Sequence, residues 1–250
     1  VERYDPSTNQ WESLQSLSTP RNCPSLVALN GKLFCIGGST TSSVDLATVE
    51  VYDPSSNQWS SGVSLPIPLT HLSAVVVGGK ILVAGGQNSG GSSNQVFEFD
   101  PFTNQWTQKS SMLSARNGLR MVVEAGKVYA LGGNIPKAER YDPVSDTWTS
   151  LPDMLVRRAY PFVWSNNGFV YAASGNSGYF ESSIEVFDPV SQSWSFTGNV
   201  PSPRHGSGSV ILGNKVYMIA GDLGSSFYTN KVFAADLIPH RDLYFRSAAS

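Results

Sequence analysis

Val49-Glu50-Val51-Tyr52-Asp53-Pro54, with Trp59 five residues further on, is the stretch from which the architecture of this chain can be predicted. The alternation of apolar and polar residues at 49–52 predicts a strand with one buried face. Asp53 and Pro54 predict a tight turn after this strand, because the carboxylate can accept backbone N–H groups while the proline ring fixes φ. Trp59 then lies in a second short strand.

The same motif recurs along the whole chain. Every Asp of an Asp-Pro pair lies six residues before a tryptophan, and every such tryptophan lies 26 residues before a doublet of small residues. The tryptophans are Trp11, Trp59, Trp106, Trp148 and Trp194, and the doublets begin at Gly37, Gly85, Gly132, Ser174 and Ala220. Fixed offsets in five copies indicate a structural repeat of roughly 45 residues.

A hairpin precedes each doublet. In the first copy, apolar runs at 26–29 and 32–36 flank Asn30-Gly31, a pair that favours the tight turn of a β-hairpin. Both runs are apolar almost throughout, so we expect them to be buried on both faces. Each repeat thus supplies four antiparallel strands, as in a propeller blade, and the large tryptophan rings suit the seam between two blades.

The Gly-Gly doublet, the Tyr-Asp-Pro sequence and the downstream tryptophan resemble the kelch repeat, over essentially the whole chain. The resemblance implies an all-β fold, a kelch-type β-propeller of four-stranded antiparallel blades, as a single domain over residues 1–250. We expect a half-blade at 1–15. The repeats are expected near 16–63, 64–110, 111–152, 153–198 and 199–245.

The number of blades has two interpretations. The strand expected at 232–236 has lost its proline and tryptophan, and the chain both opens and closes on this type of strand. We favour a six-bladed parent, because members of the family commonly have six blades and the first residues look like a piece cut from a longer protein. In the alternative, a five-bladed closure, the half-blade joins the hairpin at 206–220 and strand 232–236 is left over.

Composition excludes some partners. The formal net charge is −2, only 14% of residues are charged, and there is no run of Lys or Arg, so we expect no nucleic-acid partner. The longest apolar stretch, 74–84, is interrupted by two glycines and a lysine and is too short to insert into a membrane. Cys23 and Cys35 fit no zinc or thioredoxin spacing, and the sequence leaves intracellular and secreted locations both open.

An arginine recurs ten residues after the tryptophan in four of the five copies. The residues at this position are Arg21, Leu69, Arg116, Arg158 and Arg204. One interpretation is a ring of anion-binding groups. We favour the other, a structural strut that donates to loop carbonyls, because the guanidinium group carries five donors in a fixed geometry.

Only one segment of the repeat varies in length, the loop from the doublet to the next Asp-Pro pair. Variation confined to one loop of each repeat indicates a binding face. Two of these loops carry adjacent aromatic residues, and exposed aromatic side chains are efficient anchors for a partner. The alternative is that one ring of each pair packs onto its own blade.

The kelch resemblance extends to the binding residues. In kelch domains of cullin-ligase adaptors, peptides contact the residue after the doublet and the two residues after the arginine. With the loop aromatics added, the candidate partner-binding residues are Asn22, Ser39, His71, Gln87, Asn117, Asn134, Tyr160, Asn176, Tyr179, Phe180, His205, Asp222, Phe227 and Tyr228. This mouth of the propeller is polar and nearly uncharged, which suits a polar peptide or a glycan.

The common phosphate-binding, zinc and nucleophile-elbow motifs are all missing from the sequence, so we expect no catalytic residue, metal or cofactor. The sequence therefore predicts a non-catalytic, monomeric module that binds a protein or peptide partner. The alternative is a carbohydrate-binding or sugar-isomerising kelch propeller on an extracellular protein.

Overall fold

The computed structural model describes residues 1–224, 228–237 and 246–247. All regular elements in these residues are strands. The described residues contain no helix that is long and apolar enough to cross a membrane. The chain groups into two compact units, unit 1 with Val1–Asn117 and Pro143–Thr147, and unit 2 with Gly118–Asp142 and Trp148–Ser250.

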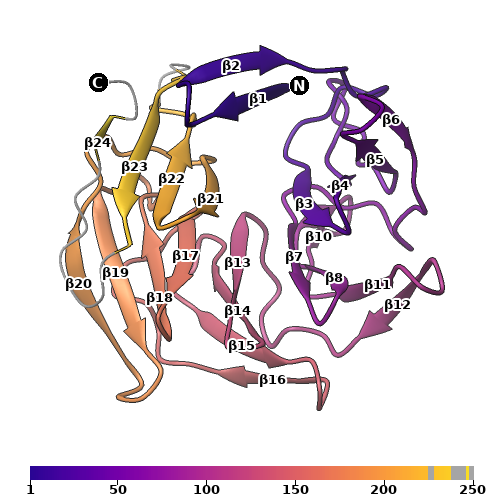
Figure 1. The fold of residues 1–250 in the computed structure, drawn as a ribbon. Coiled ribbons are helices and arrows are strands. Elements are labelled where there is room, and N and C mark those ends of the chain that lie inside the picture. The colour runs from indigo at the N-terminus through magenta and orange to yellow at the C-terminus, as the bar shows by residue number, and fades with distance from the viewer. Residues whose placement is uncertain (225–227, 238–245, 248–250) are drawn as a thin grey trace. The chain divides into compact units, whose positions relative to one another are not determined.

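Unit 1 contains two four-stranded antiparallel blades, drawn in purple and magenta in Figure 1. The first blade consists of β3 (Ser25–Leu29), β4 (Lys32–Ile36), β5 (Val49–Asp53) and β6 (Gln58–Ser61). The second consists of β7 (Ser73–Val77), β8 (Lys80–Ala84), β11 (Val96–Asp100) and β12 (Gln105–Lys109). Two smaller sheets are formed by β1 (Glu2–Asp5) with β2 (Gln10–Ser13) and by β9 (Gln87–Asn88) with β10 (Gly91–Ser92).

Unit 2 contains three further blades of the same topology. The first consists of β13 (Leu119–Glu124), β14 (Lys127–Gly132), β15 (Ala138–Asp142) and β16 (Thr147–Ser150). The next consists of β17 (Phe162–Asn166), β18 (Phe169–Ala173), β19 (Ser183–Asp188) and β20 (Ser193–Asn199). The last consists of β21 (Gly208–Leu212), β22 (Lys215–Ile219), β23 (Val232–Asp236) and β24 (Arg246–Ser247).

The register of the outer two strands repeats from blade to blade. Tyr52 lies opposite Trp59 across β5 and β6, and Phe187 lies opposite Trp194 across β19 and β20, with ring centroids 5.1 and 5.2 Å apart. The indole N–H of Trp59 donates to the carbonyl of Gln15 in the preceding repeat, at 2.9 Å. This confirms that Trp59 joins successive repeats. Trp11, by contrast, is 43% exposed, although we expected a seam position for every tryptophan.

Apolar side chains between neighbouring blades form the core of each unit. In unit 1, Ile36 and Val49 of one blade pack with Ile81 and Val83 of the next. The second strands of the hairpins come closest to the expected burial: β8 is buried at every residue after Lys80, whereas Leu33 and Phe34 of β4 are only partly buried. The first strands differ, because β21 is exposed at all five residues. The expectation that both hairpin strands are buried on both faces is therefore wrong for β21 and also for β3, where Leu26 is 56% exposed and Ala28 is exposed as well.

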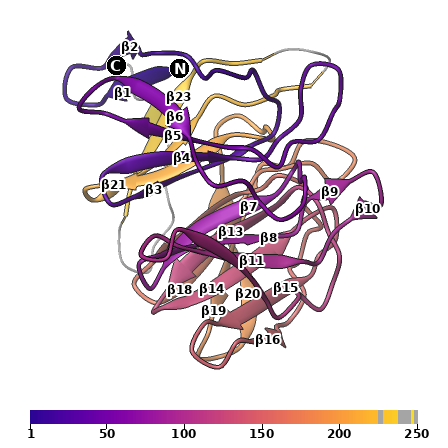
Figure 2. The same cartoon turned by 90° about the vertical axis from the view of Figure 1, so that its right-hand side faces the viewer.

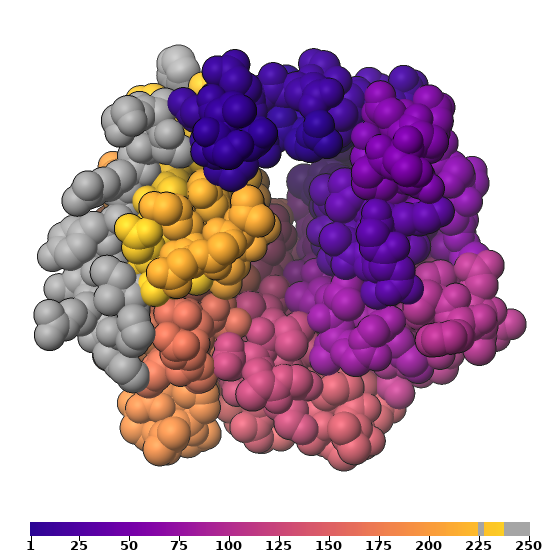
Figure 3. Space-filling model, in the orientation of Figure 1, coloured from indigo at the N-terminus to yellow at the C-terminus, as the bar shows by residue number. Residues whose placement is uncertain are grey.

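Five four-stranded blades are present in the described residues, the number given by the five-bladed alternative. That alternative required the strand at Val232–Asp236 to be left over, but this strand is part of the last blade. It pairs with β22, because Val232, Phe233 and Ala235 keep the buried apolar positions of the motif. The half-blade β1–β2 is a two-stranded sheet in which Tyr4 faces Trp11 in the same register as in a blade. Its side chains are mostly exposed, as the indigo atoms in Figure 3 show.

The Asp-Pro turns carry carboxylates that stabilise the fold. Oδ1 of Asp53 accepts the hydroxyl of Ser55 at 2.6 Å and its backbone N–H at 2.9 Å, and Lys32 lies 3.2 Å away. These hydrogen bonds and this cation lower the pKa of Asp53 to about 2. Hydrogen bonds from Ser7 likewise lower the pKa of Asp5.

We predict that the contribution of Asp53 to stability is lost in acid. A carboxyl group whose pKa is lower in the folded chain stabilises the fold above its unfolded pKa of about 3.9, and this stabilisation disappears as the pH falls through the folded value, about 2 here. In urea unfolding, the midpoint of Asp53→Asn should lie below that of the wild type at pH 5, and the two should converge toward pH 2. Ser55→Ala, which removes one donor, should give an intermediate difference. An equal gap at both pH values would contradict this role.

Candidate functional site

A buried arginine lies at the start of the loop region in four of the five repeats. The side chain of Arg21 is fully buried, and Arg158 and Arg204 are at most 1% exposed. Nη1 of each donates to the carbonyl of the first residue of the doublet 16 residues later: Gly37 at 2.9 Å, Ser174 at 2.7 Å and Ala220 at 3.0 Å. The arginines are therefore struts, because a guanidinium group without solvent access cannot serve as an anion-binding ring.

A buried glutamate completes the strut in two of these repeats. Glu50 lies 2.6 Å from Arg21 and Glu185 lies 2.8 Å from Arg158. Each carboxylate also fixes the incoming chain, as Glu185 does by accepting the backbone N–H of Leu155 at 2.6 Å. Burial would raise the pKa of Glu50, but the hydrogen bonds from Ser18 and Arg21 outweigh burial and lower it.

In two repeats, other residues occupy the arginine or glutamate position. In the second blade of unit 1, Leu69 occupies the position of the arginine and Phe97 occupies the position of the glutamate. Both side chains are buried in the apolar core of the unit. In the last repeat the arginine remains, but Phe233 occupies the position of the glutamate and its ring lies 4.7 Å from the Arg204 guanidinium. Burial lowers the pKa of Arg204. Among the described residues, Arg204 forms no ion pair.

In four of the five repeats, the two candidate positions that flank the loop are paired through the backbone. The residue after the arginine position and the residue after the doublet form an antiparallel bridge, with both N–H groups donating to both carbonyls. In the last repeat, His205 donates to Asp222 at 3.1 Å and receives a hydrogen bond of 3.0 Å in return. The bridged pairs are Asn22–Ser39, Thr70–Gln87, Ala159–Asn176 and His205–Asp222. Only the side chains of these residues remain available to a partner.

Asn117 in unit 1 and Asn134 in unit 2 have other hydrogen-bond partners. Nδ2 of Asn117 donates to the hydroxyl of Ser92 at 2.8 Å, which holds it against the β9–β10 hairpin. Asn134 is exposed, has a positive φ of 63° and donates its backbone N–H to the carbonyl of Arg158 at 3.0 Å.

The second residue after the arginine position has a left-handed backbone in every repeat. The φ values are 49° for Cys23, 55° for His71, 65° for Gly118, 51° for Tyr160 and 68° for Gly206. Glycine adopts this conformation without steric cost, whereas other residues lose about 1–2 kcal/mol. Non-glycine residues held in such strained conformations are frequent at functional sites. His71 and Tyr160, both predicted for partner binding, belong to this group.

Hydrogen bonds connect these left-handed residues in series within each unit. In unit 1, His71 donates its backbone N–H to the carbonyl of Cys23 at 3.2 Å. In unit 2, Tyr160 donates to Gly118 at 2.6 Å, and Gly206 donates to Tyr160 at 3.4 Å. Within each unit, the left-handed residues of successive repeats are thus joined through their backbones.

Tyr160, Phe180 and His205 pack together in unit 2 and form what we call the aromatic cluster. The ring centroid of His205 lies 5.7 Å from that of Tyr160 and 5.2 Å from that of Phe180. Nε2 of His205 lies 3.8 Å from Oδ2 of Asp222, and the guanidinium of Arg120 lies 5.8 Å from the Tyr160 ring centroid. The structure therefore brings together four of the predicted residues.

The two loops beside the aromatic cluster, 176–181 and 222–230, contact each other through Phe180. Its ring lies so close to Gly224 that a Cβ there would be 2.5 Å from Cε2. Phe180 thus packs on the loop of the next repeat, while Tyr179 is 70% exposed. Tyr228 is 78% exposed, and Phe227 lies outside the described residues.

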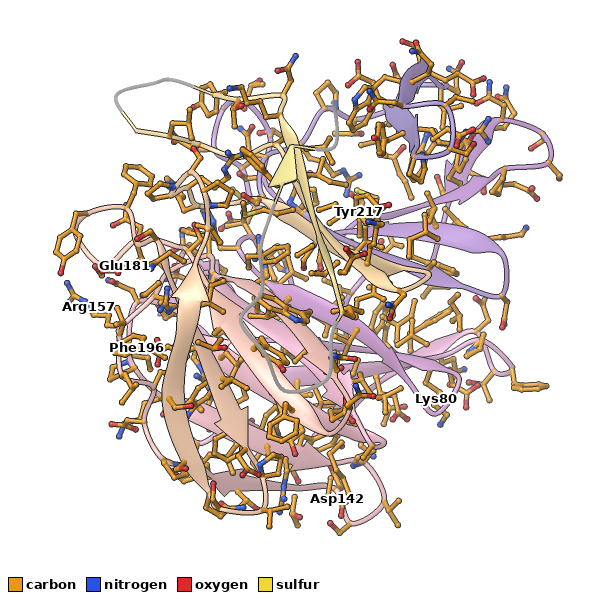
Figure 4. All side chains as sticks on the ribbon, turned by 60° about the vertical axis from the view of Figure 1, so that its left-hand side comes forward. Lys80, Asp142, Arg157, Glu181, Phe196 and Tyr217 are labelled. Atoms are coloured by element: carbon orange, nitrogen blue, oxygen red, sulfur yellow. The ribbon has the colours of Figure 1, made fainter. Side chains whose placement is uncertain are left out.

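Sequence reasoning missed three residues of this site. Arg157 donates through Nη2 to the carbonyl of Ser177 at 2.6 Å and so holds loop 176–181, and Figure 4 shows it close to Glu181. Gly224 admits the Phe180 ring, and Arg120 covers Tyr160. Arg157 directly precedes the strut arginine and could have been noticed. Gly224 and Arg120 follow no repeat pattern.

The corresponding loops of unit 1 have a different chemistry. Loop 39–45 is rich in Ser and Thr and is closed by a hydrogen bond from the N–H of Thr40 to the carbonyl of Val44 at 2.9 Å. Loop 87–94 forms the β9–β10 hairpin, visible beside β7 and β8 in Figure 2. Neither loop contains an aromatic residue. No group of His, Cys, Asp or Glu in the described part of the chain could hold a metal ion.

We predict that the two kinds of strut differ in their sensitivity to substitution. Arg158→Leu leaves Glu185 buried without its cation and should cost about 3–5 kcal/mol in the free energy of unfolding. Arg204→Leu leaves only carbonyl groups behind and should cost about 1–2 kcal/mol. The double variant R158L/E185F recreates the Leu69–Phe97 pair and should recover most of the loss. Equal costs for both single variants in urea unfolding would contradict the ion-pair explanation.

We also predict that the strain at Tyr160 can be measured. Tyr160→Ala and Tyr160→Gly both remove the ring, but only glycine relieves the left-handed backbone, so the glycine variant should be more stable by about 1 kcal/mol. The same two substitutions at Ser209, on the exposed strand β21, should have the opposite order, because glycine weakens a strand. Thermal or urea unfolding of the four variants measures the stability difference between the alanine and glycine variants at each position, and so tests both predicted orders.

Comparison with known proteins agrees with this architecture. A family model for the KLHDC2/KLHL20/DRC7 Kelch-repeats domain matches residues 1–157. No curated protein matches the chain. The solved structure of YjhT is similar at a TM-score of 0.84 and 16% identity, over 95% of this chain and 87% of that one, a likeness that concerns the fold alone. Since the family model spans more than half of the chain, the chain belongs to the KLHDC2/KLHL20/DRC7 family of kelch-repeat domains and is built from the four-stranded blades of a β-propeller.

Proposed function

We propose that this chain is a non-catalytic interaction module that binds a polar peptide or protein partner through the loop surface of unit 2. Protein binding is typical of kelch domains, and four of the predicted partner-binding residues, Tyr160, Phe180, His205 and Asp222, lie together in unit 2. The proposal rests above all on Tyr160. This residue keeps a bulky side chain at a position where Gly118 and Gly206 meet the same backbone requirement without strain.

The surroundings of Tyr160 support a binding role for its side chain. The ring of His205 packs between Tyr160 and Phe180, and Asp222 lies beside it, so the rotamers are restricted before any partner arrives. A side chain that is already ordered loses less conformational entropy on binding. Tyrosine and histidine also combine an apolar ring with a polar edge, which suits the recognition of a polar peptide.

The backbone around the cluster supports recognition by side chains. His205 and Asp222 satisfy each other's N–H and carbonyl groups, and Tyr160 uses its own N–H and carbonyl to connect Gly118 with Gly206. A partner therefore meets side chains whose positions are fixed by the repeat. Their chemistry can differ between repeats without loss of the fold.

Selection from a phage-displayed random peptide library tests the proposal. Panning on the wild type should enrich peptides whose binding is lost on Tyr160→Gly and on His205→Gln. The midpoint of urea unfolding should first be measured for both variants and should lie within about 1 M of the wild-type midpoint. Gln108→Ala, on the exposed edge of β12, is the control and should retain binding. Peptides that bind Y160G and H205Q as well as the wild type, but lose affinity on Q108A, would overturn the proposal.

A further inference from the structure

The sheet β1–β2 of unit 1 has two strands where every blade has four. In all five blades the third strand lies between the second and the fourth, as β5 lies between β4 and β6. β1 has the register of a third strand, but among the described residues it pairs with β2 alone. The carbonyl of Val1 accepts the N–H of Leu14 at 2.8 Å on the β2 side. Because successive backbone groups alternate between the two edges of a strand, the N–H of Glu2 points to the open edge.

The inner strand of the first blade exposes the face that its equivalent in the second blade buries. Ala74 and Val76 of β7 pack in the apolar core of unit 1, against the inner hairpin of the preceding blade. The same positions of β3 hold Leu26, which is 56% exposed, and Ala28, which is also exposed. This face of β3 therefore lacks the cover that a preceding inner hairpin gives to β7.

The carbonyl of Arg21 lacks the donor that its equivalents have. In four repeats, the second residue of the doublet donates its N–H to the carbonyl at the arginine position of the next repeat. These hydrogen bonds run from Gly38 to Leu69, Gly86 to Arg116, Gly133 to Arg158 and Gly175 to Arg204, at 2.9, 2.9, 2.9 and 2.8 Å. None of the described residues donates to the carbonyl of Arg21. The position is therefore ready to accept the N–H of one more doublet.

The outer part of the contact between β1–β2 and the first blade is already formed. Trp59 donates its indole N–H to the carbonyl of Gln15 at 2.9 Å. Between the two complete blades of unit 1, Trp106 donates to the carbonyl of Val63 at the same distance. The N–H of Gln15 also donates to Oδ1 of Asn57 at 3.0 Å. β1 and β2 are thus attached to the first blade as the outer half of a complete blade would be.

We propose that unit 1 binds one further kelch-type β-hairpin, supplied by a segment that precedes Val1 in the same polypeptide. The hairpin would pair with the open edge of β1, cover Leu26 and Ala28, and donate from its doublet to the carbonyl of Arg21. We call these three features the hairpin site. In each of the five blades the inner hairpin comes before the third strand in the chain, which places the occupant before β1.

The first blade shows which chemistry the occupant needs. Its hairpin covers the next blade with apolar side chains, and these are Val27, Leu29, Phe34 and Ile36. A doublet of small residues follows, because a Cβ on Gly38 would lie 2.7 Å from the carbonyl oxygen of Asn22. A hairpin of this pattern in the same polypeptide also avoids most of the entropy that association of a separate molecule costs.

The test extends the chain with one of its own hairpins. A copy of residues 72–95, which holds β7, β8, their doublet and the following loop, is joined directly before Val1, so that Val1 follows Gln95 as Val96 does. We expect the midpoint of thermal unfolding to rise by at least about 5 °C, because the added strands bury apolar surface. Hydrogen exchange at the Glu2 amide, followed by NMR, should slow at least about tenfold.

Three variants of the extended chain test the hairpin site itself. Leu26→Asp places a charge beneath the hairpin and should abolish the rise in the midpoint. Val44→Asp is the matched control, because Val44 is 58% exposed in loop 39–45 of the same unit, and the rise should persist. Glu2→Pro removes the N–H at the open edge and should reduce the rise, whereas Glu2→Val should retain it.

A second extension guards against a poor choice of hairpin. A copy of residues 25–48 before Val1 supplies β3, β4 and their doublet, and Val1 then follows Thr48 as Val49 does. If neither extension raises the midpoint or slows exchange at Glu2, the proposal is wrong. A rise that persists in L26D would overturn it as well.

The chain without an extension tests a second copy as the occupant. We expect it to sediment as a monomer, with fast exchange at the Glu2 amide. A dimer in which this amide exchanges slowly, and which dissociates on L26D, would assign the hairpin site to a second copy and overturn the proposal. These measurements do not involve Tyr160 or His205, so the proposed function can fail or stand independently of them.

Discussion

In three repeats, the hydrogen bond from a buried arginine to the carbonyl of the first doublet residue is the contact on which the loop region depends. The doublet is the point where the chain leaves the hairpin in a conformation that most residues avoid, and the carbonyl of its first residue accepts an arginine N–H. A guanidinium group that donates to this carbonyl removes the cost of burying it. In two repeats the same group also holds a glutamate that accepts N–H groups of the incoming chain, so one side chain fixes both ends of the loop.

This arrangement separates structural residues from recognition residues within a few positions of each other. Arg204 is buried and holds the backbone, whereas His205 next to it pairs through its backbone and turns its ring toward Tyr160 and Phe180. The left-handed residue that follows connects the repeats. Arginine, bridge residue and left-handed residue thus have three different physical roles in three consecutive positions, which is why the candidate site is compact in sequence as well as in space.

Much of this organisation could be predicted from the sequence because it recurs. Fixed offsets between Asp-Pro, tryptophan and doublet identify the strands, and the glycines at 118 and 206 mark a position with a special backbone. Features that occur once could not be predicted in this way. The contact of Phe180 with Gly224 depends on side-chain direction across two repeats, and the pairing of Val232–Asp236 with β22 depends on buried apolar residues that remain after the motif is lost.

The interchange of Arg–Glu and Leu–Phe at one structural position has an evolutionary consequence. Because an ion pair and an apolar pair fill the same space in repeats with the same topology, a duplicated repeat can drift from one chemistry to the other through an intermediate such as Arg204–Phe233. Such an intermediate is itself compatible with a folded blade, so the glutamate can be replaced before the arginine without leaving a buried carboxylate unpaired. Internal duplication followed by independent drift of the copies could then produce new loop specificities while the ancestral strand order persists.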